Sequence, residues 1–98
     1  APDPGKPVVL VVENDPSYAA LVRRRAEAEG AAVLTTGSGE EALRLAAAHP
    51  PALVLLDLLL DPPFDGWQVL NGLRNRPATA QTPIVVFTVV DDAASALA

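Results

Sequence analysis

Oxygen-bearing side chains stand at the ends of three apolar runs in this sequence. The first run leads into Glu13, Asn14 and Asp15, the second ends on Asp57, and the third ends on Thr88. Such a run indicates a strand buried on both faces, where a carboxylate would be costly. At the carboxyl end of a parallel strand, the same side chain reaches the edge where open α/β sheets bind ligands. The pattern therefore predicts that one sheet edge gathers these oxygen ligands.

A carboxylate at such an edge can act as a nucleophile and form an aspartyl phosphate. The attacking oxygen and the incoming group are both anionic, so the reaction needs a divalent cation, and Mg²⁺ prefers a few carboxylate or carbonyl oxygens plus water and phosphate. Simpler interpretations stay open. Asp57 could be a turn residue or a helix cap, residues 13–15 could be a solvated turn that caps a helix, and Thr88 could be an ordinary strand residue.

The elements that would position these side chains alternate along the chain. Strands are expected at residues 8–12, 31–35, 52–57 and 84–88, and helices are expected to begin at Asp15-Pro16, at the capping box Ser38 to Glu41, at Asp65-Gly66 and at Asp91. Three apolar stripes are expected to face the core: Tyr18, Leu21, Val22 and Ala26; Ala42, Leu43 and Ala46; and Trp67, Leu70 and Leu73. Alternating strands and helices imply a parallel sheet with right-handed crossovers and helices on both faces.

Three segments of the chain resemble the receiver domain of bacterial response regulators. They are VLVVENDP at 9–16, LVLLDLLLDPPFDGWQVL at 53–70 and TPIVVFT at 82–88. The acidic cluster, the aspartate, the Asp-Gly pair before a helix and the terminal threonine occur in the family's order over roughly residues 7–98. The resemblance implies a flavodoxin-like, doubly wound α/β fold with sheet order 2-1-3-4, the fifth strand being absent or unseen.

The resemblance also implies a role for each residue at the sheet edge. Asp57 would be the phosphoacceptor, and the Thr88 hydroxyl would hydrogen-bond the phosphoryl group. Glu13, Asn14, Asp57 and the backbone carbonyl of Leu59 would hold Mg²⁺. The donor would be a histidine kinase or a phosphotransfer protein, and phosphorylation would switch a partner-binding surface. The chain would then be a signalling phosphoacceptor rather than an enzyme, limited to its own phosphorylation and dephosphorylation.

Several positions depart from the family pattern. Asn14 stands where the family has a second acid, so weaker Mg²⁺ binding is expected. The loop between Asp57 and Gly66 is one residue longer than usual, and Val89 replaces a small residue. The family's lysine at the end of a fifth strand has no counterpart, since Lys6 is the only lysine. These departures favour a rival interpretation, a pseudo-receiver that binds a partner without phosphorylation. An aspartate-nucleophile phosphohydrolase is less well supported, because neither a general acid nor a downstream lysine is visible.

Composition bounds the remaining possibilities. The chain has 98 residues, half of them hydrophobic, which suits one small domain. A net charge of -5 argues against nucleic-acid binding by this segment, and no apolar stretch reaches membrane-spanning length. We expect a flexible segment at residues 1–6 and a C-terminally incomplete receiver domain at 7–98, in a cytoplasmic protein. Without a fifth strand, residues 85–87 would form an apolar edge that favours pairing of two chains as a homodimer.

Overall fold

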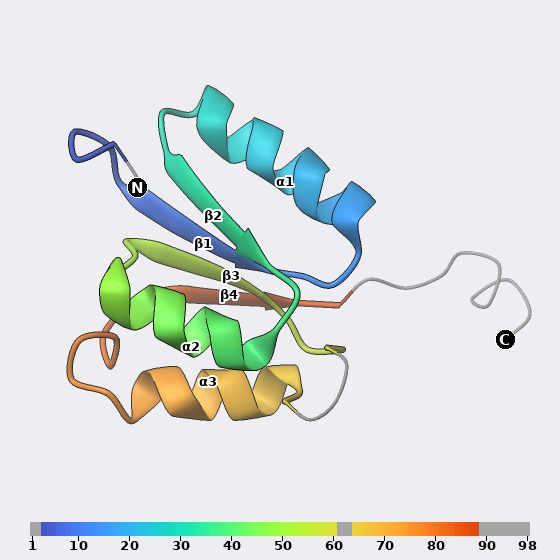
Figure 1. Cartoon of the computed structure of the whole chain (residues 1–98), viewed down its shortest axis with the longest axis vertical. Helices are drawn as coiled ribbons and strands as arrows, with labels where there is room; N and C mark the ends of the chain where they lie inside the picture. Colours follow the sequence, from blue (N-terminus) through green and yellow to red (C-terminus); the bar gives the residue numbers. More distant parts are fainter. Residues whose placement is uncertain (1–2, 61–63, 89–98) are drawn as a thin grey trace, which may run out of the picture.

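The computed structural model describes residues 3–60 and 64–88, in which strands and helices alternate (Figure 1). The elements are β1 (Val8–Val12), α1 (Pro16–Ala28), β2 (Ala32–Thr36), α2 (Gly39–Ala48), β3 (Leu53–Asp57), α3 (Gly66–Arg74) and β4 (Ile84–Phe87). The predicted strands are all present, although β2 begins and ends one residue later than expected. The predicted helix at Asp91, together with Val89 and residues 61–63 of the long loop, lies outside the described residues.

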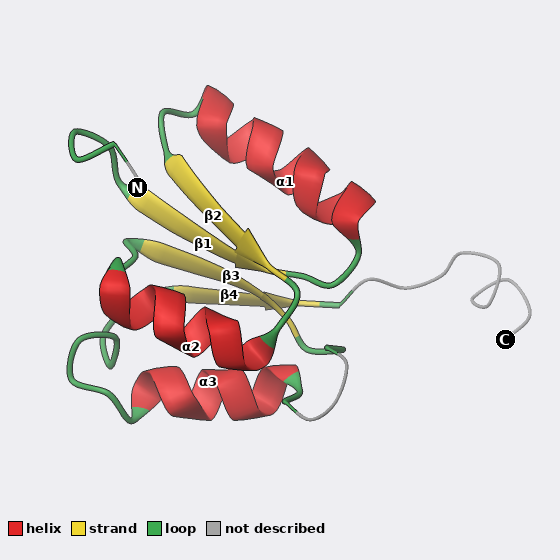
Figure 2. Ribbon diagram, in the orientation of Figure 1, coloured by secondary structure: helices red, strands yellow, loops and turns green. Residues whose placement is uncertain are grey.

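The four strands form one parallel sheet in the order β2-β1-β3-β4, which confirms the predicted topology. Figure 2 shows α1 on one side of this sheet and α2 with α3 on the other, so helices cover both faces. None of the helices in the described part is both long and apolar enough to cross a membrane.

Two hydrophobic clusters lie on opposite faces of the sheet. The larger cluster joins β1 and β3 to α2 and α3, and its buried members are Leu10, Val12, Ala42, Leu43, Ala46, Val54, Leu56, Leu60, Val69 and Leu73. The smaller cluster lies beneath α1 and contains Val9, Val11, Ala31 and Val33, with Val22, Ala26, Leu53 and Leu55 packed against it. Successive residues of β1 and β3 therefore point to opposite clusters, as the period of a strand requires.

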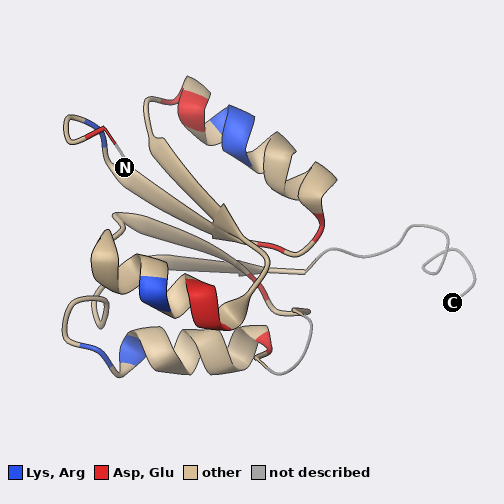
Figure 3. Cartoon of the chain, in the orientation of Figure 1, with Lys and Arg blue, Asp and Glu red and all other residues tan. Residues whose placement is uncertain are grey.

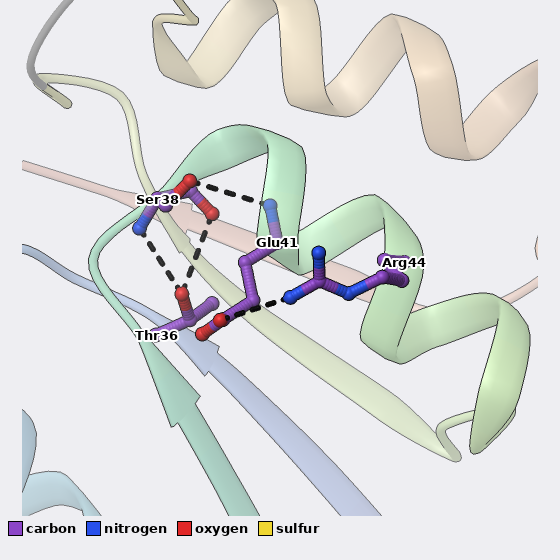
Figure 4. Close-up of polar contacts among 4 residues, drawn as sticks. All are labelled: Thr36, Ser38, Glu41 and Arg44. Atoms are coloured by element: carbon purple, nitrogen blue, oxygen red, sulfur yellow. Dashed lines mark hydrogen bonds and ion pairs between the residues drawn. The ribbon is translucent and has the colours of Figure 1, made fainter.

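Residues at the start of α2 make polar contacts that differ from the predicted capping box (Figure 4). Ser38 Oγ accepts a hydrogen bond from the Glu41 amide at 3.3 Å, so half of the box is present. The Ser38 amide, however, donates to Thr36 Oγ1 at 3.1 Å, and Glu41 Oε2 pairs with Arg44 at 3.1 Å. The predicted return contact from Glu41 is wrong, because the Thr36 hydroxyl already satisfies the Ser38 amide.

The other two helices begin as predicted. Asp15 caps α1, since its Oδ1 accepts from the Ser17 amide at 2.9 Å and from the Tyr18 amide at 3.2 Å. Asp65 caps α3 in a reciprocal box, in which Gln68 and Asp65 each accept from the other's backbone amide, at 2.8 and 2.9 Å. These caps satisfy backbone donors that a helix start leaves free.

Two helical faces differ from the predicted stripes. In α3, Trp67 is 61% exposed, whereas Val69 and Leu73 are fully buried. In α1, both Tyr18 and Leu21 lie at the surface. The prediction that Trp67 packs in the core is wrong, because α3 offers two overlapping apolar stripes and the sheet selects the one that carries Val69.

One arginine holds the connection between α3 and β4. Arg74 Nη1 donates to the carbonyl oxygens of Thr79, Ala80 and Thr82 at 3.3, 3.0 and 2.7 Å. The buried Thr79 hydroxyl donates to the Leu73 carbonyl at 2.6 Å. These contacts fix where β4 begins, and they therefore also fix where its carboxyl end lies.

Candidate functional site

Glu13 and Asp57 lie beside each other at the carboxyl edge of the sheet. β1 and β3 are parallel, with Val11 opposite Leu55. Two steps further along this register place Glu13 beside Asp57, and neighbouring strands are about 4.8 Å apart. Val11 and Leu55 belong to the cluster beneath α1, so the alternation of side chains turns both carboxylates toward that face. Figure 3 shows negative charge at this edge, where β1 and β3 end.

The two carboxylates are buried, and the described residues give them no basic partner. Glu13 is 3% exposed and Asp57 is 2% exposed, while both ion pairs of the described residues lie on helix surfaces. Glu13 Oε1 accepts from the Asp15 amide at 2.8 Å, but the buried Glu13 Oε2 has no hydrogen-bond partner in the part of the chain described. Burial, together with the neighbouring Asp57 carboxylate, raises the pKa of Glu13 to about 7. Such a site is one that a cation would stabilise.

The backbone that follows Asp57 holds this carboxylate in place. The Leu59 amide donates to Asp57 Oδ1 at 2.9 Å, and the Leu58 amide donates to the Phe87 carbonyl at 2.9 Å. The Gly66 amide donates to the Leu58 carbonyl at 3.1 Å, which joins the start of α3 to the same loop. A Cβ atom at Gly66 would lie 2.4 Å from Leu58 Cα and 2.5 Å from the Asp57 carbonyl oxygen, so this close approach requires glycine.

Asn14 is exposed at the end of β1, next to Glu13. The Glu13 amide donates to the Thr36 carbonyl at 2.9 Å, which extends the pairing of β1 with β2 by one residue. Gly37, which follows β2, lies close to Asn14: a Cβ atom at Gly37 would be 3.1 Å from Asn14 Cα. Glu13 and Asn14 line a cavity of about 360 Å³ between α1 and the end of β2, and Arg23 of α1 lines the same cavity.

Thr88 lies at the same edge, directly after β4. Its neighbour Phe87 is the register partner of Asp57 in the adjacent strand, so Thr88 stands one residue beyond the candidate phosphoacceptor. Thr88 is exposed. The Phe87 ring lies 5.5 Å, centroid to centroid, from the ring of Tyr18 at the start of α1. The three polar strand ends that the sequence predicted to meet are therefore brought together, with β1 and β4 on either side of Asp57.

The carboxyl edge of the sheet carries the kinds of oxygen atom that the predicted Mg²⁺ site requires. The described residues contain no cluster of three or more His, Cys, Asp or Glu side chains that could hold an ion. The candidate site has two carboxylates, Glu13 and Asp57, and its other predicted ligands are the Asn14 amide oxygen and the Leu59 carbonyl. Mg²⁺ binds such oxygens and keeps several waters, and the unpartnered Glu13 Oε2 fits a cation. The assignment of these four ligands stays a prediction.

Two glycines lie close to the site: Gly66 was predicted only as part of a helix start, and Gly37 had no predicted role. Gly37 lies against the backbone of Asn14, and Gly66 lies against the backbone at Asp57 and Leu58. Both stand where a strand end meets the beginning of a helix. A glycine at such a junction is a signal of close backbone approach, and it could have been interpreted in that way.

Comparison with known proteins gives consistent matches. The family model described as response regulator receiver domain matches residues 9–98. The transcriptional regulatory protein KdpE of Mycobacterium tuberculosis is 38% identical over 85 residues, which is 87% of this chain and 36% of KdpE. The alkaline phosphatase synthesis transcriptional regulatory protein PhoP of Bacillus subtilis is 36% identical over 84 residues, 86% of this chain and 34% of PhoP. The chain thus spans about a third of the length of these relatives.

Solved structures of receiver domains have a fold similar to that of this chain. The signal receiver domain of a modulated diguanylate cyclase from Desulfovibrio desulfuricans superposes with a TM-score of 0.77 at 33% identity, covering 93% of this chain and 71% of that one. The N-terminal domain of a response regulator receiver protein from Methanoculleus marisnigri gives a TM-score of 0.77 at 34% identity, covering 91% of this chain and 74% of that one.

Proposed function

Because this chain belongs to the receiver-domain family of response regulators, we propose that Asp57 accepts a phosphoryl group from a histidine kinase or a phosphotransfer protein in a Mg²⁺-dependent step. The chain is then a signalling phosphoacceptor in a two-component system. Its chemistry is limited to its own phosphorylation and dephosphorylation, and its output is a change in a surface that a partner recognises.

The observation that carries this proposal is the buried pair of carboxylates at the ends of β1 and β3. Glu13 and Asp57 are almost fully buried and side by side, although each would be more stable in water. A fold without a use for this pair would gain stability by replacing one of them. A bound cation would offset the cost of burying the two negative charges. The ion and the two carboxylates together would then serve phosphoryl transfer.

Each residue of the site has its own role in the proposed phosphoryl transfer. The Leu59 amide holds Asp57 Oδ1 and so orients the carboxylate for attack. An Asp57 oxygen forms a bond to phosphorus while the bond between phosphorus and the donor nitrogen breaks, and the electron pair stays on that nitrogen. Glu13, Asn14, Asp57 and the Leu59 carbonyl would hold Mg²⁺. The ion would neutralise charge on the transferring group.

Thr88 connects phosphorylation to a surface change in this proposal. Its hydroxyl hydrogen-bonds the phosphoryl group, which favours one position of the end of β4 over another. Phe87 moves with Thr88 because the two are adjacent, and the Phe87 ring lies 5.5 Å from that of Tyr18 on α1. A shift at the end of β4 therefore reaches the surface of α1, where a partner could respond to it.

Labelling experiments test the assignment of Asp57. Acetyl phosphate with Mg²⁺ should add one phosphoryl group to the wild-type chain, as measured by intact mass spectrometry. Asp57→Asn should abolish the adduct, whereas Asp65→Asn makes the same chemical change at a helix cap, where asparagine serves equally well, and should retain it. An adduct that persists in Asp57→Asn would show that another residue is the acceptor.

A second candidate function, the phosphorylation-independent pseudo-receiver, is favoured by one observation. Asn14 contributes an amide in place of a charge, so the described residues hold only two acidic side chains at the candidate metal site. The two functions differ in a simple measurement. A phosphoacceptor binds beryllium fluoride, a phosphoryl analogue, in the presence of Mg²⁺, whereas a pseudo-receiver shows no heat of binding in calorimetry.

A further inference from the structure

Two large apolar side chains in the segments next to Asp57 are exposed, and neither belongs to a hydrophobic cluster of the described residues. Leu59 is 63% exposed and Trp67 is 61% exposed. The backbone places both near the phosphoacceptor: the Leu59 amide donates to Asp57 Oδ1 at 2.9 Å, and the residue before Trp67 donates its amide to the Leu58 carbonyl at 3.1 Å. We call Leu59 and Trp67 the rim pair.

The rim pair lies outside both hydrophobic clusters that the described part of the chain forms. On α3 the buried positions are Gly66, Val69 and Leu73, and Trp67 lies on the other side of the helix. After β3 it is Leu60, not Leu59, that joins the larger hydrophobic cluster. Exposed aromatic and aliphatic side chains close to a functional site mark interaction surfaces, and tryptophan is prominent among the residues that dominate binding energy.

The charge of the site indicates what kind of partner this surface serves. A phosphodonor is anionic, and it must approach Glu13 and Asp57, which are acidic and have no basic partner in the described residues. Contacts inside the site therefore bind the donor poorly until a cation is present. Binding energy from parts of the donor remote from phosphorus can offset that repulsion. Backbone hydrogen bonds join the segments of the rim pair to Asp57 and Leu58, so a partner large enough to cover Asp57 also lies against them.

We propose that the rim pair is a docking contact for the protein that donates the phosphoryl group, and that Trp67 is its main anchor. The partner presents an apolar patch beside its phosphorylated side chain, and this patch covers Trp67 and Leu59. A small phosphodonor reaches Asp57 without touching Trp67. The inference rests on the proposed phosphoacceptor function and adds a residue that determines which donors are used.

Comparing a protein donor with a small donor distinguishes an effect on docking from an effect on phosphoryl transfer. Purified histidine kinases are autophosphorylated with radiolabelled ATP, and the one that labels the wild-type chain fastest serves as the protein donor, while acetyl phosphate serves as the small donor. Trp67→Ala should lower the initial rate from the kinase by about 10-fold or more and change the rate from acetyl phosphate by less than about 2-fold. Trp67→Phe should keep most of the kinase rate. Asn71→Ala, one turn further along α3, is the matched control and should leave both rates unchanged.

Competition provides a second readout that needs no chemistry at this chain. The Asp57→Asn chain should inhibit labelling of wild type by the kinase, and the double variant Asp57→Asn/Trp67→Ala should need about 10-fold more protein for the same inhibition. Circular dichroism of each variant shows whether it folds.

Four results would overturn the proposal. They are an unchanged kinase rate in Trp67→Ala, an equal loss with both donors, labelling of wild type by acetyl phosphate but by no kinase, and loss of self-association rather than of kinase labelling in sedimentation of Trp67→Ala. The last would assign the rim pair to contact with a second copy of the chain. If neither donor labels wild type, the phosphoacceptor function itself is wrong, which is a distinct outcome.

Discussion

Ionisation of Glu13 should weaken the fold, and the size of the effect follows from its burial. The pKa of this carboxyl is about 7 in the folded chain, compared with 4.5 for an unperturbed glutamate. Between these two values the folded state binds more protons than the unfolded state, so the free energy of unfolding falls as pH rises. Below pH 4.5 and above pH 7, the ionisation of Glu13 causes no further change in the free energy of unfolding. A tenfold change in proton affinity is worth about 1.4 kcal/mol, which gives a total loss of about 3 kcal/mol.

Glu13→Gln isolates this contribution, because the amide cannot ionise. We expect the free energy of unfolding of the variant, relative to that of wild type, to rise by about 3 kcal/mol between pH 4.5 and pH 8. Urea unfolding followed by far-ultraviolet circular dichroism measures this difference. Glu27→Gln, an exposed position on α1, is the matched control and should run parallel to wild type. Mg²⁺ added at pH 8 should stabilise wild type more than Glu13→Gln, since it binds the ionised carboxylate.

One result would refute the reasoning. If the difference between wild type and Glu13→Gln is the same at pH 4.5 and pH 8, Glu13 does not ionise in a buried position beside Asp57. The register that places the two carboxylates together would then be wrong at the end of β1.

Three further predictions concern other parts of the site and the sheet. Asn14→Asp should tighten Mg²⁺ binding about 10-fold in calorimetry, because it adds a negative charge near a divalent cation; an unchanged affinity would mean that residue 14 does not face the ion. Gly66→Ala should lower the free energy of unfolding by about 3 kcal/mol, since its Cβ would overlap Leu58, and a neutral result would contradict the close approach. The exposed Val86 of β4, an edge strand among the described residues, should promote self-association of the 98-residue chain, which Val86→Lys should suppress in sedimentation.

The location of the site could be predicted because it depends on patterns local to the chain, whereas the strand order was implied only by the resemblance to receiver domains, since local patterns do not say which strands pair. Apolar runs that end in Glu13, Asp57 and Thr88 specify which strands are buried and where their ligands lie. The exposure of Trp67 could not be predicted, because helical spacing defines a stripe without saying which of two stripes meets the sheet. The clamp formed by Arg74 was missed for a related reason, since its carbonyl partners are brought near only by the turn that follows α3.

The shared register of β1 and β3 has a consequence for how this sequence can change. Inserting or deleting one residue within β3 would turn Asp57 from the α1 face to the opposite face, and it would turn the buried Leu56 the other way in the same step. A mutant that loses the site by this route also loses its core. Length variation within the central strands is therefore eliminated by selection for folding alone, even in a lineage that no longer needs phosphorylation. A descendant that abandons the chemistry would do so through point substitutions at the strand ends, which leave the register and the core intact.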